Sequence, residues 1–240
     1  MMDILLLVGM GLVIWMVGND GPWGAGITFV SVLMSGLIAM NFFEPLANLM
    51  GRAVMTSYDW QIRWDIICLL GIFSLCVFLF RTIGEQLLPT YAELSSPVYE
   101  GARWGFAALT AYAVAAFVCT SLHVAPLPRE FLGFTAESRN LFGMAPDRQW
   151  LGFTQHASEK SLMRMRADNR PALFDVAYFP SNPADVRTTK EWSSFPIRYA
   201  ARRQQFASGG APLPVQSNVP LAPPGPPVPV NNPNAGTGGF

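Results

Sequence analysis

The chain has 240 residues, of which 51% are hydrophobic and only 13% are charged. Soluble globular domains carry about 25% charged residues, so this composition argues against an ordinary soluble protein. Sixteen Lys and Arg residues balance sixteen Asp and Glu residues. This balance excludes the strongly basic character of many nucleic-acid binders and the acidic bias of a highly solvated chain. No nucleic-acid partner is therefore predicted.

The balanced charge hides two different halves. Residues 1–125 contain 4 basic and 8 acidic residues, whereas residues 126–240 contain 12 basic and 8 acidic residues. The three cysteines, Cys68, Cys76 and Cys119, lie in apolar stretches, where they are expected to be buried and not joined in disulfides. The two histidines, His123 and His156, add no spacing typical of a zinc site. Neither a metal nor a cofactor is predicted.

Four apolar segments dominate the first half, at residues 4–18, 23–43, 64–80 and 104–122. A spanning helix needs about 20 apolar residues, so the second segment is the clearest span and the first is short. A signal peptide is the alternative for the first segment, but it would need a basic start and a cleavage site. Trp23, Trp64 and Trp104 each begin a segment, where indole rings favour the boundary between water and lipid. We predict an all-α membrane domain of four transmembrane helices over residues 1–125.

The second segment has an ambiguous end at Pro45. Proline normally disrupts the interior of a helix. Apolar residues nevertheless recur at helical spacing beyond it, at Leu46, Leu49, Met50 and Val54. This pattern predicts either a short amphipathic helix at the membrane surface or an extension of the span.

Small residues in the fourth segment predict close helix packing. Apolar helices in lipid associate where small side chains let backbones approach. The fourth segment carries such residues at Gly101, Gly105, Ala108, Ala111 and Ala115. Plausible partners are Gly9 and Gly11 in the first segment and Gly36 with Ser31 and Ser35 in the second. The alternative is that these residues merely reflect the general composition of membrane helices.

The second half divides into an appendage and a tail. Pro146 and Asp147 are typical of a helix start, and residues 147–166 predict one amphipathic helix with Trp150, Leu151, Thr154, Ala157 and Leu162 near one face. The rest of the appendage, residues 126–206, is expected to be mostly loop because it contains Pro171, Pro180, Pro183 and Pro196. The uncharged, Pro/Gly-rich residues 207–240 predict a disordered tail. An SH3-like ligand at residues 223–229 is the alternative for the tail.

Few residues suggest chemistry. Asp65 and His123 lie near the ends of their segments, which favours contact with lipid headgroups over a buried proton pathway. Three carboxylates between the third and fourth segments, Glu85, Glu93 and Glu100, alternate with apolar residues and indicate an amphipathic surface segment more than an acid–base pair. Catalytic and nucleotide-binding motifs are missing from the sequence. The protein is therefore predicted not to be an enzyme.

Several of these residues also form a family-like pattern: Asp3; Gly18, Gly21 and Gly24; Glu44-Pro45-Leu46; Gly101, Arg103 and Gly105; and Ser121-Leu122-His123-Val124-Ala125-Pro126. With the four short spans, this pattern resembles the bacterial colicin V production protein family over residues 1 to about 128. Members often carry an arginine beside glycine after the first span, where this chain has Asn19, Asp20 and Gly21. The resemblance implies an inner-membrane protein linked with toxin production or export, and it supplies no catalytic residue.

The arginines suggest an orientation for the four spans. Arg52, Arg63, Arg129 and Arg139 fall on the side of the termini, and Arg81 and Arg103 fall on the other, which predicts cytoplasmic termini. The leading hypothesis is a structural or assembly factor that contacts the bilayer and forms homo-oligomers or binds other membrane proteins. The alternative is an oligomeric channel or small-solute transporter, suggested by Thr28, Ser31, Ser35 and Asn41. A membrane-tethered enzyme or adaptor in residues 126–206 is the third hypothesis.

Overall fold

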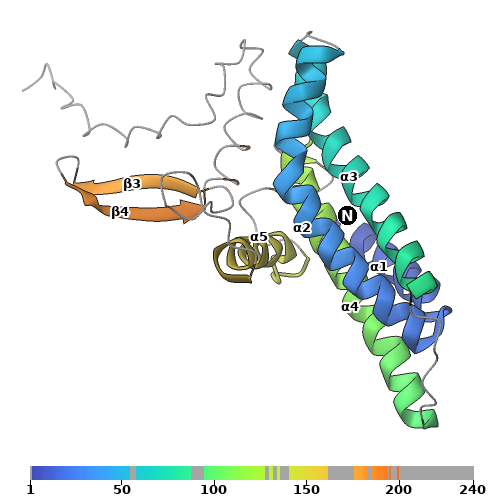
Figure 1. The fold of residues 1–240 in the computed structure, drawn as a ribbon. Coiled ribbons are helices and arrows are strands. Elements are labelled where there is room, and N and C mark those ends of the chain that lie inside the picture. Colours follow the sequence, from blue (N-terminus) through green and yellow to red (C-terminus); the bar gives the residue numbers. More distant parts are fainter. Residues whose placement is uncertain are drawn as a thin grey trace, which may run out of the picture.

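The structure is a computed structural model that describes residues 2–54, 58–87, 95–127, 130–131, 134–135, 141–161, 176–182, 185–193, 195 and 199. Its described part is built around α1 (Met2–Gly18), α2 (Gly21–Ala53), α3 (Tyr58–Leu87), α4 (Ser96–Val124) and α5 (Pro146–His156) (Figure 1). The prediction of an all-α bundle is confirmed. By length and composition, α2, α4 and the part of α3 from Arg63 to Leu87 are candidate membrane spans, and α1 is a shorter apolar helix of 17 residues. The chain therefore has the character of a multi-pass membrane protein.

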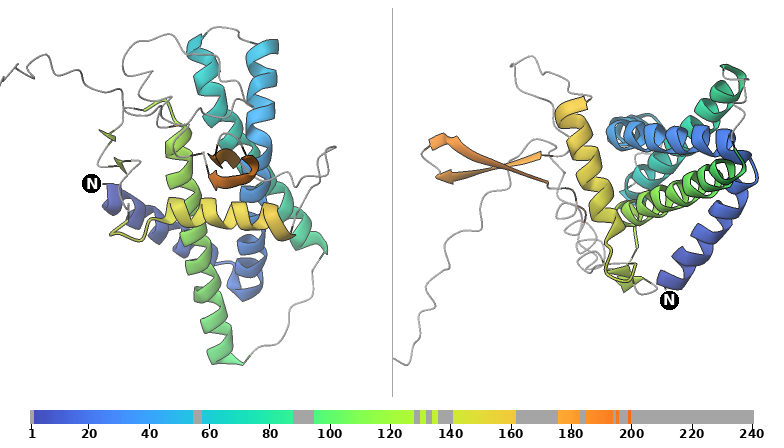
Figure 2. Two further views of the ribbon diagram at one scale, coloured as in Figure 1. Left: turned by 90° about the vertical axis from the view of Figure 1, so that its left-hand side faces the viewer. Right: turned by 90° about the horizontal axis from the view of Figure 1, so that it is seen from below.

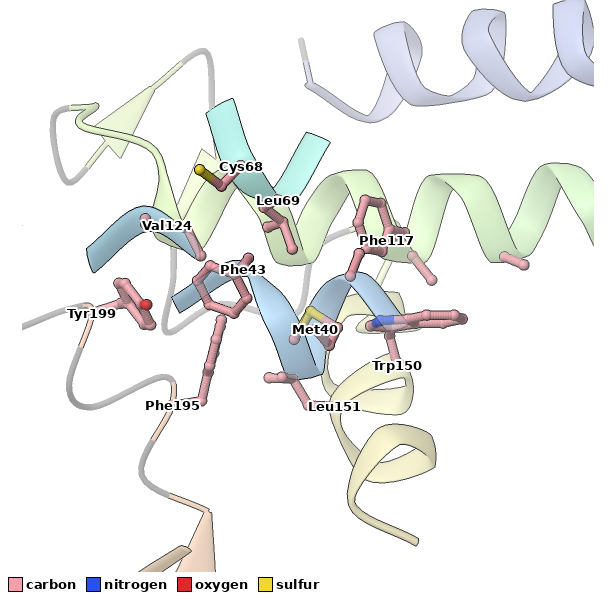
Figure 3. Close-up of a cluster of buried hydrophobic side chains, with 14 of the residues drawn as sticks. Met40, Phe43, Cys68, Leu69, Phe117, Val124, Trp150, Leu151, Phe195 and Tyr199 are labelled. Carbon is pink, nitrogen blue, oxygen red and sulfur yellow. The ribbon is translucent and has the colours of Figure 1, made fainter. Parts of the chain in front are cut away.

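Helix α2 is the centre of the bundle. It packs against α3 and α4 on either side, while α1 lies mainly against α4. Figure 2 shows α1 running obliquely to the three longer helices. The core between α2, α3 and α4 contains the fully buried Phe43, Leu69 and Phe117 (Figure 3). The ring of Phe117 stacks on that of Phe73 at a centroid distance of 4.0 Å, so aromatic packing joins α3 to α4.

Pro45 does not end α2, which continues to Ala53. Of the two sequence-based alternatives, extension of the helix is therefore correct. A proline has no N–H to donate to the carbonyl four residues earlier, here that of Asn41. The Asn41 side chain donates to the carbonyl of Leu37 at 2.7 Å, and Pro45 itself is exposed. Helical packing of the flanking Phe43 and Ala47 in the core accounts for the unbroken helix.

The end of the bundle at the α1–α2 turn is fastened by two arginines. Gly21 has a φ of +74° in this turn, a conformation that glycine adopts without strain. Arg103 of α4 donates from Nε to the carbonyl oxygen of Gly18. Arg81 of α3 donates from Nη2 to the carboxylate of Asp20 at 2.8 Å and from Nε to that of Glu85 at 2.9 Å. The turn is thus held from both later helices.

The segment beyond α4 contains more regular structure than the sequence predicts. Two antiparallel pairs occur, β1 (Glu130–Phe131) with β2 (Phe134–Thr135), and β3 (Val176–Asn182) with β4 (Asp185–Ser193). The expectation of loop is wrong for β3 and β4, which pair along most of their length. Pro180 lies within β3, next to an irregularity in the register. Prolines are tolerated at such irregular or edge positions. The tail at residues 207–240 lies outside the described residues.

Candidate functional site between the bundle and α5

Helix α5 lies across the helical bundle and close to its surface (Figure 2). It begins after Ala145, which has the left-handed values φ 50° and ψ 59°, so the chain turns sharply before the helix. Pro146 occupies the first turn and Asp147 follows it, as the sequence predicts. The predicted apolar face is confirmed for the buried Trp150, Leu151, Thr154 and Ala157. The helix is shorter than predicted, since a π-helical turn, η1 (Ala157–Ser161), follows it, and Leu162 lies outside the described residues.

A buried histidine–aspartate pair joins α4 to α5. The Nε2 atom of His123 lies 2.9 Å from Oδ2 of Asp147, and both side chains are only 1% exposed. The ring of Phe134 packs edge-on against the imidazole at a centroid distance of 5.3 Å. The expectation that His123 faces lipid headgroups is therefore wrong. The reason is that α5 covers the end of α4 and excludes both lipid and water from the imidazole.

The pair keeps two polar atoms without a hydrogen-bond partner among the described residues, Nδ1 of His123 and Oδ1 of Asp147. A buried polar atom without a partner costs about 1–3 kcal/mol. The hydrogen bond between His123 and Asp147 therefore offsets only part of the cost of burying the two side chains. Loss of either member leaves the other buried and unpaired. Thr120, whose hydroxyl lies 3.5 Å from the Asp147 carbonyl and 2.9 Å from that of Ala116, adds only a long contact to α5.

Two further contacts hold the chain around this pair. The backbone N–H of Leu141 donates to Oδ1 of Asp3 at 3.0 Å, which ties the first turn of α1 to the turn before α5. The hydroxyl of Tyr112 donates to Oε1 of Gln149 at 2.7 Å. Polar contacts from α1 and α4 thus converge on the start of α5.

The apolar half of the site is centred on Trp150. Its indole ring lies against Gly36 of α2, where a Cβ atom would overlap the ring. The same ring meets Phe117 of α4 edge-on at a centroid distance of 5.9 Å (Figure 3). Gly36 was one of the predicted packing glycines, but its contact is with α5 and not with a neighbouring span. Trp150 is thereby anchored on two helices of the bundle.

A later segment of the chain also reaches the bundle. Phe195 and Tyr199 are buried with the α2–α3–α4 core, and the Phe195 ring meets Phe43 edge-on at 6.5 Å. The Tyr199 hydroxyl donates to Oε1 of Glu44 at 3.0 Å. Sequence analysis missed these residues, although two aromatic residues four apart are a recognisable signal for a shared helix face.

The predicted small-residue stripe of α4 divides into two parts. Ala111 and Ala115 are buried in the bundle. Gly101, Gly105 and Ala108 are exposed, and no atom lies within 4 Å of the position of a Cβ at either glycine. Adjacent residues of α4 contact the α1–α2 region, Trp104 at Gly18 and Phe106 at Gly26, so the exposed part of the stripe lies on an outward face of α4.

The polar residues suggested for a channel lie mostly inside the bundle. Thr28, Ser31 and Ser35 are at most 5% exposed, whereas Asn41 is exposed and bonded to its own helix. Asp65 is also buried, at 8% exposure, contrary to the expectation that it faces headgroups. Within the part of the chain that the structure describes, no three His, Cys, Asp or Glu side chains gather in a way that suits a metal ion.

Comparisons with known protein families, with curated proteins and with solved structures find no match. The resemblance to colicin V production proteins therefore stays a prediction from the sequence.

Proposed function

We propose that this protein is a membrane assembly factor, comparable in role to the colicin V production proteins that its first half resembles. It would act in the inner membrane with both termini in the cytoplasm, through contacts with further copies or with other membrane proteins, and without an enzymatic step. The observation that carries the proposal is the fixed position of α5. Its inner face is held by Trp150 on Gly36 and by the His123–Asp147 pair, while its outer face carries the exposed Arg148, Phe153 and His156.

Helix α5 is held in place on its inner face and exposes both charged and aromatic side chains on its outer face, which suits a surface for protein contact. Phe153 is 40% exposed and its ring lies beside that of Trp150 at a centroid distance of 5.6 Å. Arginine and aromatic side chains are enriched where proteins meet. The burial of Thr28, Ser31 and Ser35 supports the assembly role over the channel alternative, because side chains at most 5% exposed do not line an open water-filled path. The four-span topology and an oligomer through Gly101 and Gly105 belong to the same proposal.

Site-specific photo-crosslinking in native membranes tests the assembly role. A photoreactive residue at Phe153 should give discrete protein adducts, and the same residue at Phe78, which is 67% exposed on α3, should give mainly lipid adducts. Purified protein in liposomes should show no solute flux under an imposed gradient. Lipid adducts alone at Phe153, together with gradient-driven flux, would replace the assembly role by the transporter alternative.

A further inference from the structure

An apolar groove runs along the outer side of α2, next to the last turns of α3. Its volume is about 490 Å³, and Phe106 of α4 closes one side. The floor includes Trp23, Gly26 and Val30 of α2, and the wall includes Ile83 and Gly84 of α3. A Cβ at Gly84 would lie 2.7 Å from Cγ2 of Ile27, so this glycine permits the close approach of α2 and α3 along the groove.

The groove has the depth of a single bilayer leaflet. It extends along α2 from Pro22 to Met34, which is about 18 Å at the rise of an α-helix. One half of the hydrocarbon layer measures about 15 Å. The groove begins beside Trp23, at the start of the apolar part of α2, where tryptophan favours the membrane surface. A spanning helix of a second copy would need a surface twice as deep, whereas one acyl chain fits this depth.

Charged residues neighbour the lining residues of the groove in the sequence at its surface end. Arg81 directly follows Phe80 of the groove wall, and Arg103 lies one turn before Phe106. Arg81 pairs with Asp20 and Glu85, and Nη1 of Arg103 lies 3.5 Å from Oε1 of Glu100. Each guanidinium has five N–H groups and uses only some of them in these contacts. Two arginines beside three carboxylates complement a headgroup that carries both a phosphate and an ammonium.

We propose that the groove binds one zwitterionic aminophospholipid of the surrounding leaflet. One acyl chain lies over Gly26 and Val30, the phosphate accepts hydrogen bonds from Arg81 and Arg103, and the ammonium lies beside the carboxylates of Asp20, Glu85 and Glu100. The three carboxylates disfavour an anionic headgroup. This site goes beyond the assembly role and depends on neither α5 nor self-association.

The full-length protein is tested in bilayers that contain phosphatidylethanolamine, phosphatidylcholine and phosphatidylglycerol. After extraction in a mild detergent, mass spectrometry counts the phospholipids retained per chain. The expected result is one retained phosphatidylethanolamine. Arg103→Gln should reduce retention about tenfold, the effect of losing one charge-assisted hydrogen bond.

A filled groove provides the decisive comparison. Val30→Trp places an indole in the groove and should abolish retention, whereas Val8→Trp introduces the same residue on the lipid-facing side of α1. Val30 and Val8 are 57% and 59% exposed, so both substitutions leave the core intact and should unfold at the wild-type temperature. Equal retention by the two variants, or preferential retention of phosphatidylglycerol, would overturn the proposal. Crosslinks from a cysteine at Val30 to a second copy would overturn it as well. None of these results would alter the crosslinking expected at Phe153.

Discussion

The indole of Trp150 lies against Gly36, with Cζ2 and Cη2 of its ring in the space that a Cβ atom at position 36 would fill. This contact connects the helix after the bundle to the middle of the central helix α2. The contact depends on the lack of a side chain at Gly36, so even the methyl group of an alanine at this position should disturb it.

Gly36→Ala should displace Trp150 and weaken the attachment of α5. Overpacking of this kind costs about 1–3 kcal/mol. Gly71→Ala is the matched control, because Gly71 lies in the interior of α3 with no atom within 4 Å of its Cβ position. The control should be neutral or slightly stabilising, since alanine favours the helix over glycine. Proteolysis within α5 in detergent micelles reports the difference, and equal cleavage of the two variants would contradict the role of the contact.

The His123–Asp147 pair should behave as a coupled unit. His123→Leu or Asp147→Leu alone leaves one buried polar partner without the other and should cost about 3–5 kcal/mol. The double variant removes both polar groups and should regain a large part of that loss. A double-mutant cycle on unfolding free energies measures the coupling, with the exposed His156→Leu as a neutral control. Additive losses would show that the two side chains act independently.

The left-handed backbone at Ala145 predicts a stabilising substitution. A non-glycine residue in this conformation costs about 1–2 kcal/mol, so Ala145→Gly should raise the free energy of unfolding by about 1 kcal/mol. Ala157→Gly is the comparison, since Ala157 has the ordinary helical φ of −63° and should lose stability on substitution. Thermal unfolding of both variants gives the sign of each effect, and a loss at position 145 would contradict the assigned backbone conformation.

Gly101 and Gly105 allow association to be separated from folding. Both positions have open space around them, so Gly101→Leu and Gly105→Leu should leave the unfolding temperature of the monomer unchanged. If the exposed part of the α4 stripe binds another copy, the same variants should lose most crosslinking between chains in membranes. Undiminished crosslinking would exclude this face from the interface.

The apolar segments were sufficient to predict the helices, because spanning length and continuous hydrophobicity are properties of each segment alone. They were not sufficient to predict which small residues pack inward. Ala111 and Gly105 look equivalent in the sequence, yet only Ala111 is buried in the bundle. Gly105 lies on an outward face of α4, although its neighbours Trp104 and Phe106 contact Gly18 and Gly26. Burial in lipid and burial in protein favour the same apolar residues, so composition does not distinguish them.

The candidate site was only half visible in the sequence. Pro146 and Asp147 correctly predicted a helix start, but the partner of Asp147 lies 24 residues earlier, at a position expected to face headgroups. The docking of α5 decides this burial, and docking depends on Gly36, which was expected to pack against the fourth segment and not against α5. The β3–β4 pair was missed for a different reason, since Pro180 argues against a regular strand.

The hydrogen bonds that hold the α1–α2 turn form in a fixed order during synthesis of the chain. The accepting groups, the carbonyl of Gly18 and the carboxylate of Asp20, are synthesised first, while the donors Arg103 and Arg81 arrive with the last two helices of the bundle. The N-terminal helical hairpin therefore enters the bilayer without either contact. Helix α3 then supplies the contact to Asp20, and the contact to Gly18 at the end of α1 forms only when α4 is in place. A ribosome stalled before Arg103 would expose a half-built bundle whose first helix is still loose.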